Sequence, residues 1–212
     1  MLHLSESQLI EIRNLAPLED SKFKYDLSRW GKLHQELSNV VKHFGDQYIS
    51  RQDVINSFQD YFNRKIGIEF PFVLTMIWGF ADTGYGTYRT NAYYNTENIR
   101  RMESAFAHVK NKDIQKSYKE LKKIKGLNIS YISKLLYFST RALNHSDYYL
   151  IFDIRVATAL VKLTCPPNLV NLIDVKPSDK FQNYCQYNAE MHLLAKRYDV
   201  SAEALEMYLF LY

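Results

Sequence analysis

The chain has 212 residues, 47% of them apolar and 24% charged, and its formal net charge is +4. A chain of this length can bury a substantial core, so we expect a single globular unit over residues 1–212 that functions as a monomer. The first thirty residues hold a charged side chain every few positions, which excludes a signal peptide and a spanning helix there. We therefore expect a cytoplasmic protein without a membrane partner.

The chain has only two cysteines, Cys165 and Cys185. Two thiols are too few for a disulfide framework, a four-cysteine zinc site or a cysteine-bound iron–sulfur cluster. We expect no metal and no organic cofactor. The positive net charge permits an anionic partner without demanding one.

Apolar residues recur at helical spacing through most of the chain, and seven glycines and five prolines interrupt them rarely. The sequence therefore predicts an all-α protein. Ser50 with Asp53 is typical of a capping box, and Thr96 and Ser201 are expected to open two further helices. The predicted helices cover residues 5–15, 32–44, 54–65, 72–78, 97–111, 112–124, 130–142, 154–163, 179–197 and 202–212.

Residues 78–95, WGFADTGYGTYRTNAYYN, break this pattern with three glycines, six aromatic residues and a central arginine, Arg89. We interpret them as a loop. Its tyrosines could pack at the base of a surface connection. Alternatively, its rings could line a pocket for a flat ligand such as a nucleobase, and both interpretations stay open at this point.

Seven lysines and two acidic residues lie between positions 110 and 125, and four of the lysines follow helical spacing down one face. This lysine stripe consists of Lys112, Lys116, Lys119 and Lys123. Such a stripe is usually a solvated face, but it also suits the phosphates of a nucleic acid. Its position immediately before a turn favours the second interpretation.

The turn lies in the sequence LKKIKGLNISYISKLLYF, residues 121–138, which has the layout of a helix-hairpin-helix. Gly126 can supply a positive φ, and Asn128 stands where a second glycine is usual, as the residue next most able to adopt the left-handed conformation. Such hairpins present backbone N–H groups and a helix N-terminus to a phosphate. The candidate DNA-binding residues are Lys123, Lys125, Gly126, Asn128 and Ser130.

Lys134 is the only charged residue in the otherwise apolar and aromatic first turns of the helix that follows. At 100° per residue it shares a face with Ser130, Tyr131, Tyr137 and Phe138. Its stem could lie along apolar surface with the ammonium group in water. The functional alternative is a desolvated amine with a lowered pKa that acts as a nucleophile.

Asp153 ends the apolar run YYLIF and precedes a second stretch with helical spacing. It is well placed as an N-cap, and capping alone is a sufficient reason for an aspartate here. A carboxylate held by backbone N–H groups at a helix N-terminus also stays ionised in apolar surroundings. The structural and the chemical interpretation are therefore compatible.

Together, the hairpin, the lysine in the next helix and the aspartate that opens another helix resemble the helix-hairpin-helix DNA glycosylase superfamily over about residues 115–165. The segments SYISKLLYF and FDIRVATAL are most similar to archaeal GO-type glycosylases and to bacterial proteins with an 8-oxoguanine glycosylase fold. In endonuclease III-like enzymes the nucleophilic lysine lies four residues after the first hairpin glycine, where this chain has Ser130. Lys134 lies one turn further along the same face.

The resemblance implies a two-lobed helical fold with a hairpin and catalytic core over residues 112–165, completed by packing of residues 1–111 with 166–212. It implies double-stranded DNA containing a modified base as the partner and a nucleoid-associated location. Lys134 would attack the sugar C1′ with help from Asp153, and the resulting imine would permit strand cleavage. Residues implied for the base pocket are Trp78, Tyr85, Arg89 and Tyr131.

The base expected from the resemblance is 8-oxoguanine, and a modified base in invading phage DNA is the alternative. Two other classes of function remain open. The same hairpin could belong to a DNA-binding module without catalysis, in which Lys134 contacts phosphate and Asp153 only caps. A helical protein–protein adaptor would leave the lysine stripe solvated.

The lysine stripe and the hairpin predict an affinity for DNA that falls steeply with salt, because phosphate contacts release condensed counterions. Charge reversal at Lys123 or Lys125 should weaken binding to all duplexes about equally. Fluorescence anisotropy with labelled duplexes at low and physiological ionic strength measures both effects. An affinity that does not change with salt would show that the stripe is only a solvated face.

Overall fold

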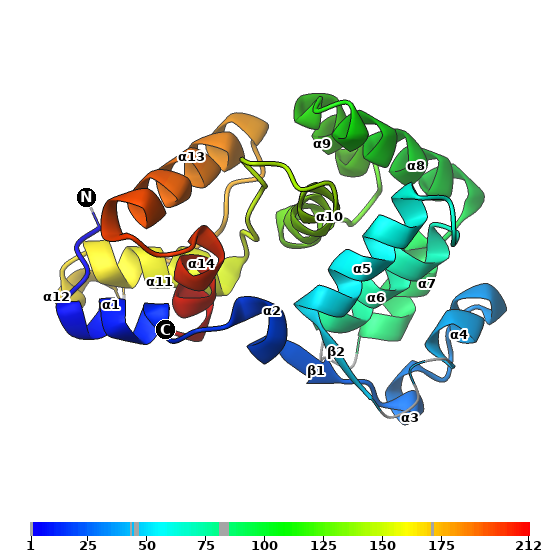
Figure 1. Cartoon of the computed structure of the whole chain (residues 1–212), viewed down its shortest axis with the longest axis horizontal. Coiled ribbons are helices and arrows are strands. Elements are labelled where there is room, and N and C mark those ends of the chain that lie inside the picture. The colour runs from blue at the N-terminus through cyan, green and yellow to red at the C-terminus, as the bar shows by residue number, and fades with distance from the viewer. Residues whose placement is uncertain (1, 43, 45–46, 81–84, 171) are drawn as a thin grey trace.

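The computed structural model describes residues 2–42, 44, 47–80, 85–170 and 172–212, and within them the chain forms helices and one two-stranded sheet (Figure 1). The prediction of an all-α protein is confirmed. No helix among these residues is long and apolar enough to cross a membrane. The elements are α1 (Glu6–Arg13), α2 (Pro17–Asp20), β1 (Lys22–Lys24), α3 (Leu27–Trp30), α4 (Gln35–Val41), β2 (Tyr48–Ser50), α5 (Arg51–Phe62), α6 (Glu69–Phe80), α7 (Gly86–Tyr93), α8 (Thr96–Lys110), α9 (Ile114–Lys122), α10 (Ile129–Ala142), α11 (Ile154–Thr164), α12 (Pro167–Val170), α13 (Phe181–Tyr198) and α14 (Ala202–Leu211).

The helices form two groups with α10 between them (Figure 1). Helices α5, α6, α8 and α9 pack against α10 from one side. On the other side, α14 contacts α1, α11 and α13. The antiparallel pair of β1 and β2 joins Lys22 to Ser50 and lies at the edge of the first group.

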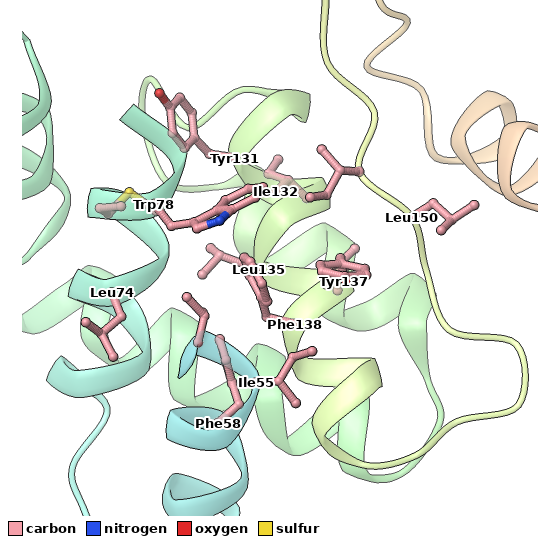
Figure 2. Packing of buried hydrophobic residues seen from close by; sticks show 14 of the residues in the cluster. Ile55, Phe58, Leu74, Trp78, Tyr131, Ile132, Leu135, Tyr137, Phe138 and Leu150 are labelled. Atoms are coloured by element: carbon pink, nitrogen blue, oxygen red, sulfur yellow. The ribbon is translucent and has the colours of Figure 1, made fainter. Parts of the chain in front are cut away.

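Helix α10 forms the centre of the core because its apolar residues cover more than one face. Ile132, Leu135 and Phe138 are fully buried, and Figure 2 shows them among side chains that include Ile55 and Trp78. The hydroxyl groups of Ser133, Ser139 and Thr140 are satisfied within the helix by bonds to carbonyls about one turn back, such as Ser139 to Leu135 at 2.6 Å. A helix buried on all sides can therefore hold polar side chains without unpaired groups.

Most of the predicted helix starts are confirmed. Ser50 and Asp53 form a capping box at the start of α5, and Ser201 caps α14. The cap of α8 is Asn95, whose side chain accepts from the N–H of residue 98, so Thr96 is the first residue of the helix rather than its cap. Both residue types suit an N-cap, and the extended backbone of Asn95 decides between them.

The prediction that residues 78–95 form a loop is wrong for the described part. Helix α6 continues to Phe80 and α7 occupies Gly86–Tyr93, while residues 81–84 lie outside the described residues. Asn91 of α7 accepts from the N–H of His34 at 2.9 Å and donates to the carbonyl of Lys32 at 2.8 Å. These tertiary bonds stabilise α7, and they also explain why the helix predicted from residue 32 begins only at Gln35.

A buried ion pair joins the two groups of helices. Arg51, the first residue of α5, donates to Glu206 of α14 at 2.6 Å, and the two side chains are 1% and 0% exposed. The guanidinium carbon also lies 5.2 Å from the ring centre of Trp78 and 5.3 Å from that of Tyr137. Tyr137 in turn donates to Glu203, also of α14, at 2.6 Å. Two carboxylates of α14 therefore attach it to α5 and α10.

We predict that Arg51→Leu lowers the free energy of unfolding by about 3–5 kcal/mol, because Glu206 would remain buried without its partner. Urea denaturation followed by circular dichroism measures the change. Asp60→Asn is the control, since it removes an exposed pair with Lys65 and should leave stability unchanged within error. Equal stabilities of the two variants would contradict the role of the buried pair.

Candidate active site

A cavity of about 390 Å³ opens where the two groups of helices meet. Its walls come from β1, α6, α10, α11 and α14, together with the segment that leads to α11. The lining residues are Phe23, Trp78, Gly79, Phe80, Ser130, Lys134, Ile151, Asp153, Ile154, Arg155, Glu206 and Phe210. Four aromatic rings and several ionisable groups therefore share one pocket, which is the composition expected of a ligand site.

Lys134 lies in this cavity and is only 5% exposed. Its Nζ is 3.2 Å from the hydroxyl of Ser130, 3.3 Å from the carbonyl of the same residue and 3.5 Å from Oδ2 of Asp153. The amine is therefore buried together with the stem. The alternative, in which only the stem is buried and the ammonium group lies in water, does not apply. Ser130, one turn before Lys134, shares its face of α10, as the spacing predicted.

The two carboxylate oxygens of Asp153 have different partners. Oδ1 accepts from the backbone N–H groups of Arg155 at 3.0 Å and Val156 at 3.2 Å, which confirms that Asp153 is the N-cap of α11. Oδ2 faces Lys134. Capping therefore fixes the carboxylate through one oxygen and leaves the other directed at the amine.

The extended segment 150–152 places Asp153, and side chains from α13 and α10 hold its backbone. Asn188 accepts from the N–H of Leu150 at 2.6 Å. Tyr184 donates to the carbonyl of Leu150 at 2.7 Å, and Tyr187 donates to that of Ile151 at 2.8 Å. Ser133 of α10 accepts from the N–H of Phe152 at 3.0 Å. A segment without secondary structure is thus fixed between two helices, so the spacing of Lys134 and Asp153 is well defined.

The surroundings of Lys134 lower the pKa of its amine. Burial lowers the pKa of Lys134, and the charges of Asp153 and Glu206 oppose this shift. Burial raises the pKa of Glu206, whereas its ion pair with Arg51 acts in the opposite direction. A lowered lysine pKa increases the fraction of the nucleophilic, uncharged form near neutral pH.

The hairpin before α10 has the predicted turn. Gly126 adopts a φ of 84°, in the left-handed region, and Tyr93 of α7 donates to its carbonyl at 2.8 Å. Asn128 is not left-handed: its φ is −91°, and its side chain accepts from the N–H of Tyr131 as the N-cap of α10. An asparagine replaces the second glycine because the position requires a cap rather than a positive φ.

Part of the lysine stripe differs from the prediction. Lys112 precedes α9 and has a φ of 59°, because it belongs to the left-handed C-terminal turn of α8. Within α9 and its C-cap, Lys116 pairs with Asp113 at 2.8 Å and Lys123 with Glu120 at 2.6 Å. In the part of the chain that the structure describes, the stripe is therefore partly neutralised by its own helix.

The predicted pocket residues separate into two pairs. Trp78 lines the cavity, and Tyr131 lies beside it, with its ring 5.4 Å from Nζ of Lys134. Tyr85, the N-cap of α7, and Arg89 within the helix are exposed and are absent from the lining. Trp78 and Tyr131 therefore lie at the cavity, whereas Tyr85 and Arg89 do not line it.

The sequence interpretation did not identify several residues that line the cavity. Phe23 of β1 and Phe210 of α14 come from opposite ends of the chain, and neither belongs to a motif. Glu206 carries the only available signal, since an acidic residue within an apolar helix requires a buried partner. Gly79 and Phe80 fell within the segment that was interpreted as a loop.

A hairpin, a buried lysine in the helix after it and an aspartate that caps the next helix, all within an all-α chain, define a helix-hairpin-helix protein of the DNA glycosylase type. The family model described as "Putative 8-oxoguanine DNA glycosylase OGG-like protein" matches residues 16–210. The chain belongs to this family. No curated protein and no solved structure matches it.

The two oxygens of Asp153 predict different effects for its two simplest substitutions. Asp153→Asn keeps a capping side chain, so Asp153→Ala should be less stable than Asp153→Asn by about 1 kcal/mol. Asp153→Asn should also lower the pKa of Lys134 further, because it removes a negative charge that raises it. Urea denaturation and NMR titration of ¹³Cε-labelled lysine measure the two effects. Equal stability of the variants would contradict the cap, and an unchanged Lys134 pKa would contradict the coupling.

Proposed function

We propose that this protein is a DNA glycosylase with AP lyase activity that removes an oxidised or otherwise modified base from double-stranded DNA. The observation that carries the proposal is the buried approach of Lys134 Nζ to Asp153 Oδ2, at 3.5 Å, inside a cavity lined by aromatic rings. Membership of the OGG-like family supports the same reaction class.

In the proposed reaction, the duplex bends and one nucleotide is extruded into the cavity. The electron pair of the uncharged Lys134 amine forms a bond to the sugar C1′, and the N-glycosidic bond breaks with its electron pair on the departing base. The base takes up a proton, and the amine loses one. The C1′–O4′ bond then breaks with a proton taken up at O4′, which gives an imine; loss of a proton from C2′ and departure of the 3′ phosphate with its electron pair break the strand.

Asp153 supports this reaction in two ways. Its Oδ2 is the carboxylate oxygen that faces Nζ, so it can accept the proton that Lys134 loses after attack. Its negative charge also stabilises the positive charge that develops on the sugar. Because Oδ1 is bound by two backbone N–H groups, neither task requires the carboxylate to move.

The aromatic wall provides the surface for the extruded base. Phe23, Phe80 and Phe210 line the cavity, and together they supply an apolar aromatic surface of the kind that a base contacts. Trp78 belongs to the same wall, but its indole N–H already donates to the carbonyl of Ser21 at 3.0 Å. We assign Trp78 to the shape of the pocket rather than to hydrogen bonding with the base.

The DNA backbone is assigned to the hairpin and the lysines near it. Lys125 and Gly126 are exposed at the turn, and Lys125 has no ion pair within the described ranges. Its charge is therefore available to phosphate, whereas that of Lys123 is shared with Glu120. We propose a monomer that acts on chromosomal DNA in the cytoplasm, or on modified DNA of an invading phage.

The substrate we propose first is 8-oxoguanine, and a modified base of phage DNA is the second candidate. A panel of labelled duplexes, each with a different modified base, separates them when base release and strand breaks are scored independently. Base release without breaks would identify a glycosylase without lyase activity. Binding without release of any base, at enzyme excess, would instead favour a DNA-binding module.

We predict that borohydride reduction traps a covalent complex between Lys134 and substrate DNA, because the imine is reducible. Lys134→Gln should abolish trapping, and Asp153→Asn should reduce base release by roughly 10²-fold, the usual scale for a positioned acid–base group. Single-turnover assays and denaturing gels provide the measurements. Lys125→Gln is the matched control, since it removes an exposed lysine outside the cavity and should weaken DNA binding without abolishing trapping. Trapping that persists in Lys134→Gln would show that another amine is the nucleophile.

A further inference from the structure

Gly79, the penultimate residue of α6, lines the cavity and faces the proposed nucleophile. Its backbone is helical and its φ is not positive, so every L-amino acid can adopt its conformation. Glycine is also the weakest helix former after proline. Backbone conformation therefore does not explain why position 79 is a glycine. The explanation lies in the atoms that surround it.

A Cβ atom at position 79 would meet the stem of Lys134. It would lie 3.0 Å from Cδ and 3.4 Å from Cε of the lysine, and 3.2 Å from Cε1 of Tyr131. The first and last of these distances are shorter than ordinary van der Waals contact. The lysine stem therefore runs over the exposed backbone of Gly79, in a slot whose other side is the ring of Tyr131.

The two neighbours differ in their freedom to move. The ring of Tyr131 stacks on Phe80, with centroids 4.5 Å apart and planes at 28°, and it is 8% exposed. The lysine has four rotatable bonds in its stem and an open cavity beside it. An added methyl group would therefore displace Lys134, and with it the amine that contacts Ser130 and Asp153.

We propose that Gly79 is a positioning residue for Lys134: the missing side chain creates the slot that holds the amine against Asp153. The inference rests on the proposed function insofar as Lys134 is the nucleophile. Gly79 itself takes no part in bond making. Its effect is to leave free the position in which the lysine stem lies when the amine contacts Asp153.

The test compares Gly79→Ala with Gly67→Ala. The three atoms nearest to a Cβ at Gly67 all belong to the carboxylate end of the Glu69 side chain, which can rotate away, and Gly67 does not line the cavity. We expect Gly79→Ala to keep or raise the melting temperature, because alanine favours helix. Its duplex affinity should equal that of wild type, while borohydride trapping and single-turnover base release fall at least 10-fold. Gly67→Ala should match wild type in both reactions.

A measurement without DNA separates this inference from the proposed function. In ¹³Cε-lysine spectra of the free protein, the Lys134 resonance is assigned by its loss in Lys134→Gln. It should shift in Gly79→Ala and stay in place in Gly67→Ala, whether or not wild type cleaves any duplex. A resonance at the wild-type position in Gly79→Ala would overturn the inference. Wild-type trapping together with a shifted resonance would overturn it as well.

If Gly79→Ala does not fold, the double variant Gly79→Ala/Lys134→Ala decides the question. Replacing Lys134 by alanine removes the Cδ atom, which is the atom closest to a Cβ at position 79. Recovery of folding in the double variant would place the crowding at Lys134 and support the inference. Failure of the double variant would show that Gly79 is needed for packing of α6, which would overturn it.

Discussion

The arrangement of this protein depends on the burial of one ammonium group beside one carboxylate. An unpaired charge in a protein interior is costly, and a pair is tolerated only when its geometry is good and its remaining hydrogen-bonding groups are satisfied. Lys134 meets this requirement with Ser130 and Asp153, and Asp153 meets it with the N-terminus of α11. The hairpin, the extended segment 150–152 and the tyrosines of α13 all contribute to placing these partners.

A second pair, Arg51 and Glu206, lies close enough to affect the first. The charges of Asp153 and Glu206 raise the pKa of Lys134, and that of Arg51 lowers it, so two basic and two acidic groups from distant parts of the chain interact at or beside the cavity. Such a balanced set keeps the net charge of the interior near zero when all four groups are ionised. Proton loss from the lysine disturbs this balance, and the developing positive charge on a bound sugar would restore it.

The sequence was sufficient for local features and for the two central residues of the candidate site. Spacing along α10 placed Ser130 and Lys134 on one face, and capping chemistry identified Asp153, because both signals depend only on neighbouring residues. The cavity walls depend on contacts between distant segments. Phe23 lies in a strand of three residues whose partner is β2, and no periodic pattern can reveal so short a pair. Helix α7 likewise owes its stability to tertiary bonds of Asn91.

The walls of the cavity also impose an order on its assembly during synthesis. Phe23 of β1 leaves the ribosome long before Glu206 and Phe210 of α14. Until α14 emerges, Arg51 is without its acidic partner, and the pocket around Lys134 is open where Phe210 later stands. A growing chain can fold its early helices as they appear. The pocket around Lys134 is therefore complete only after α14 has been synthesised, and a chain that stops before α14 carries the lysine without two of the side chains that line its cavity.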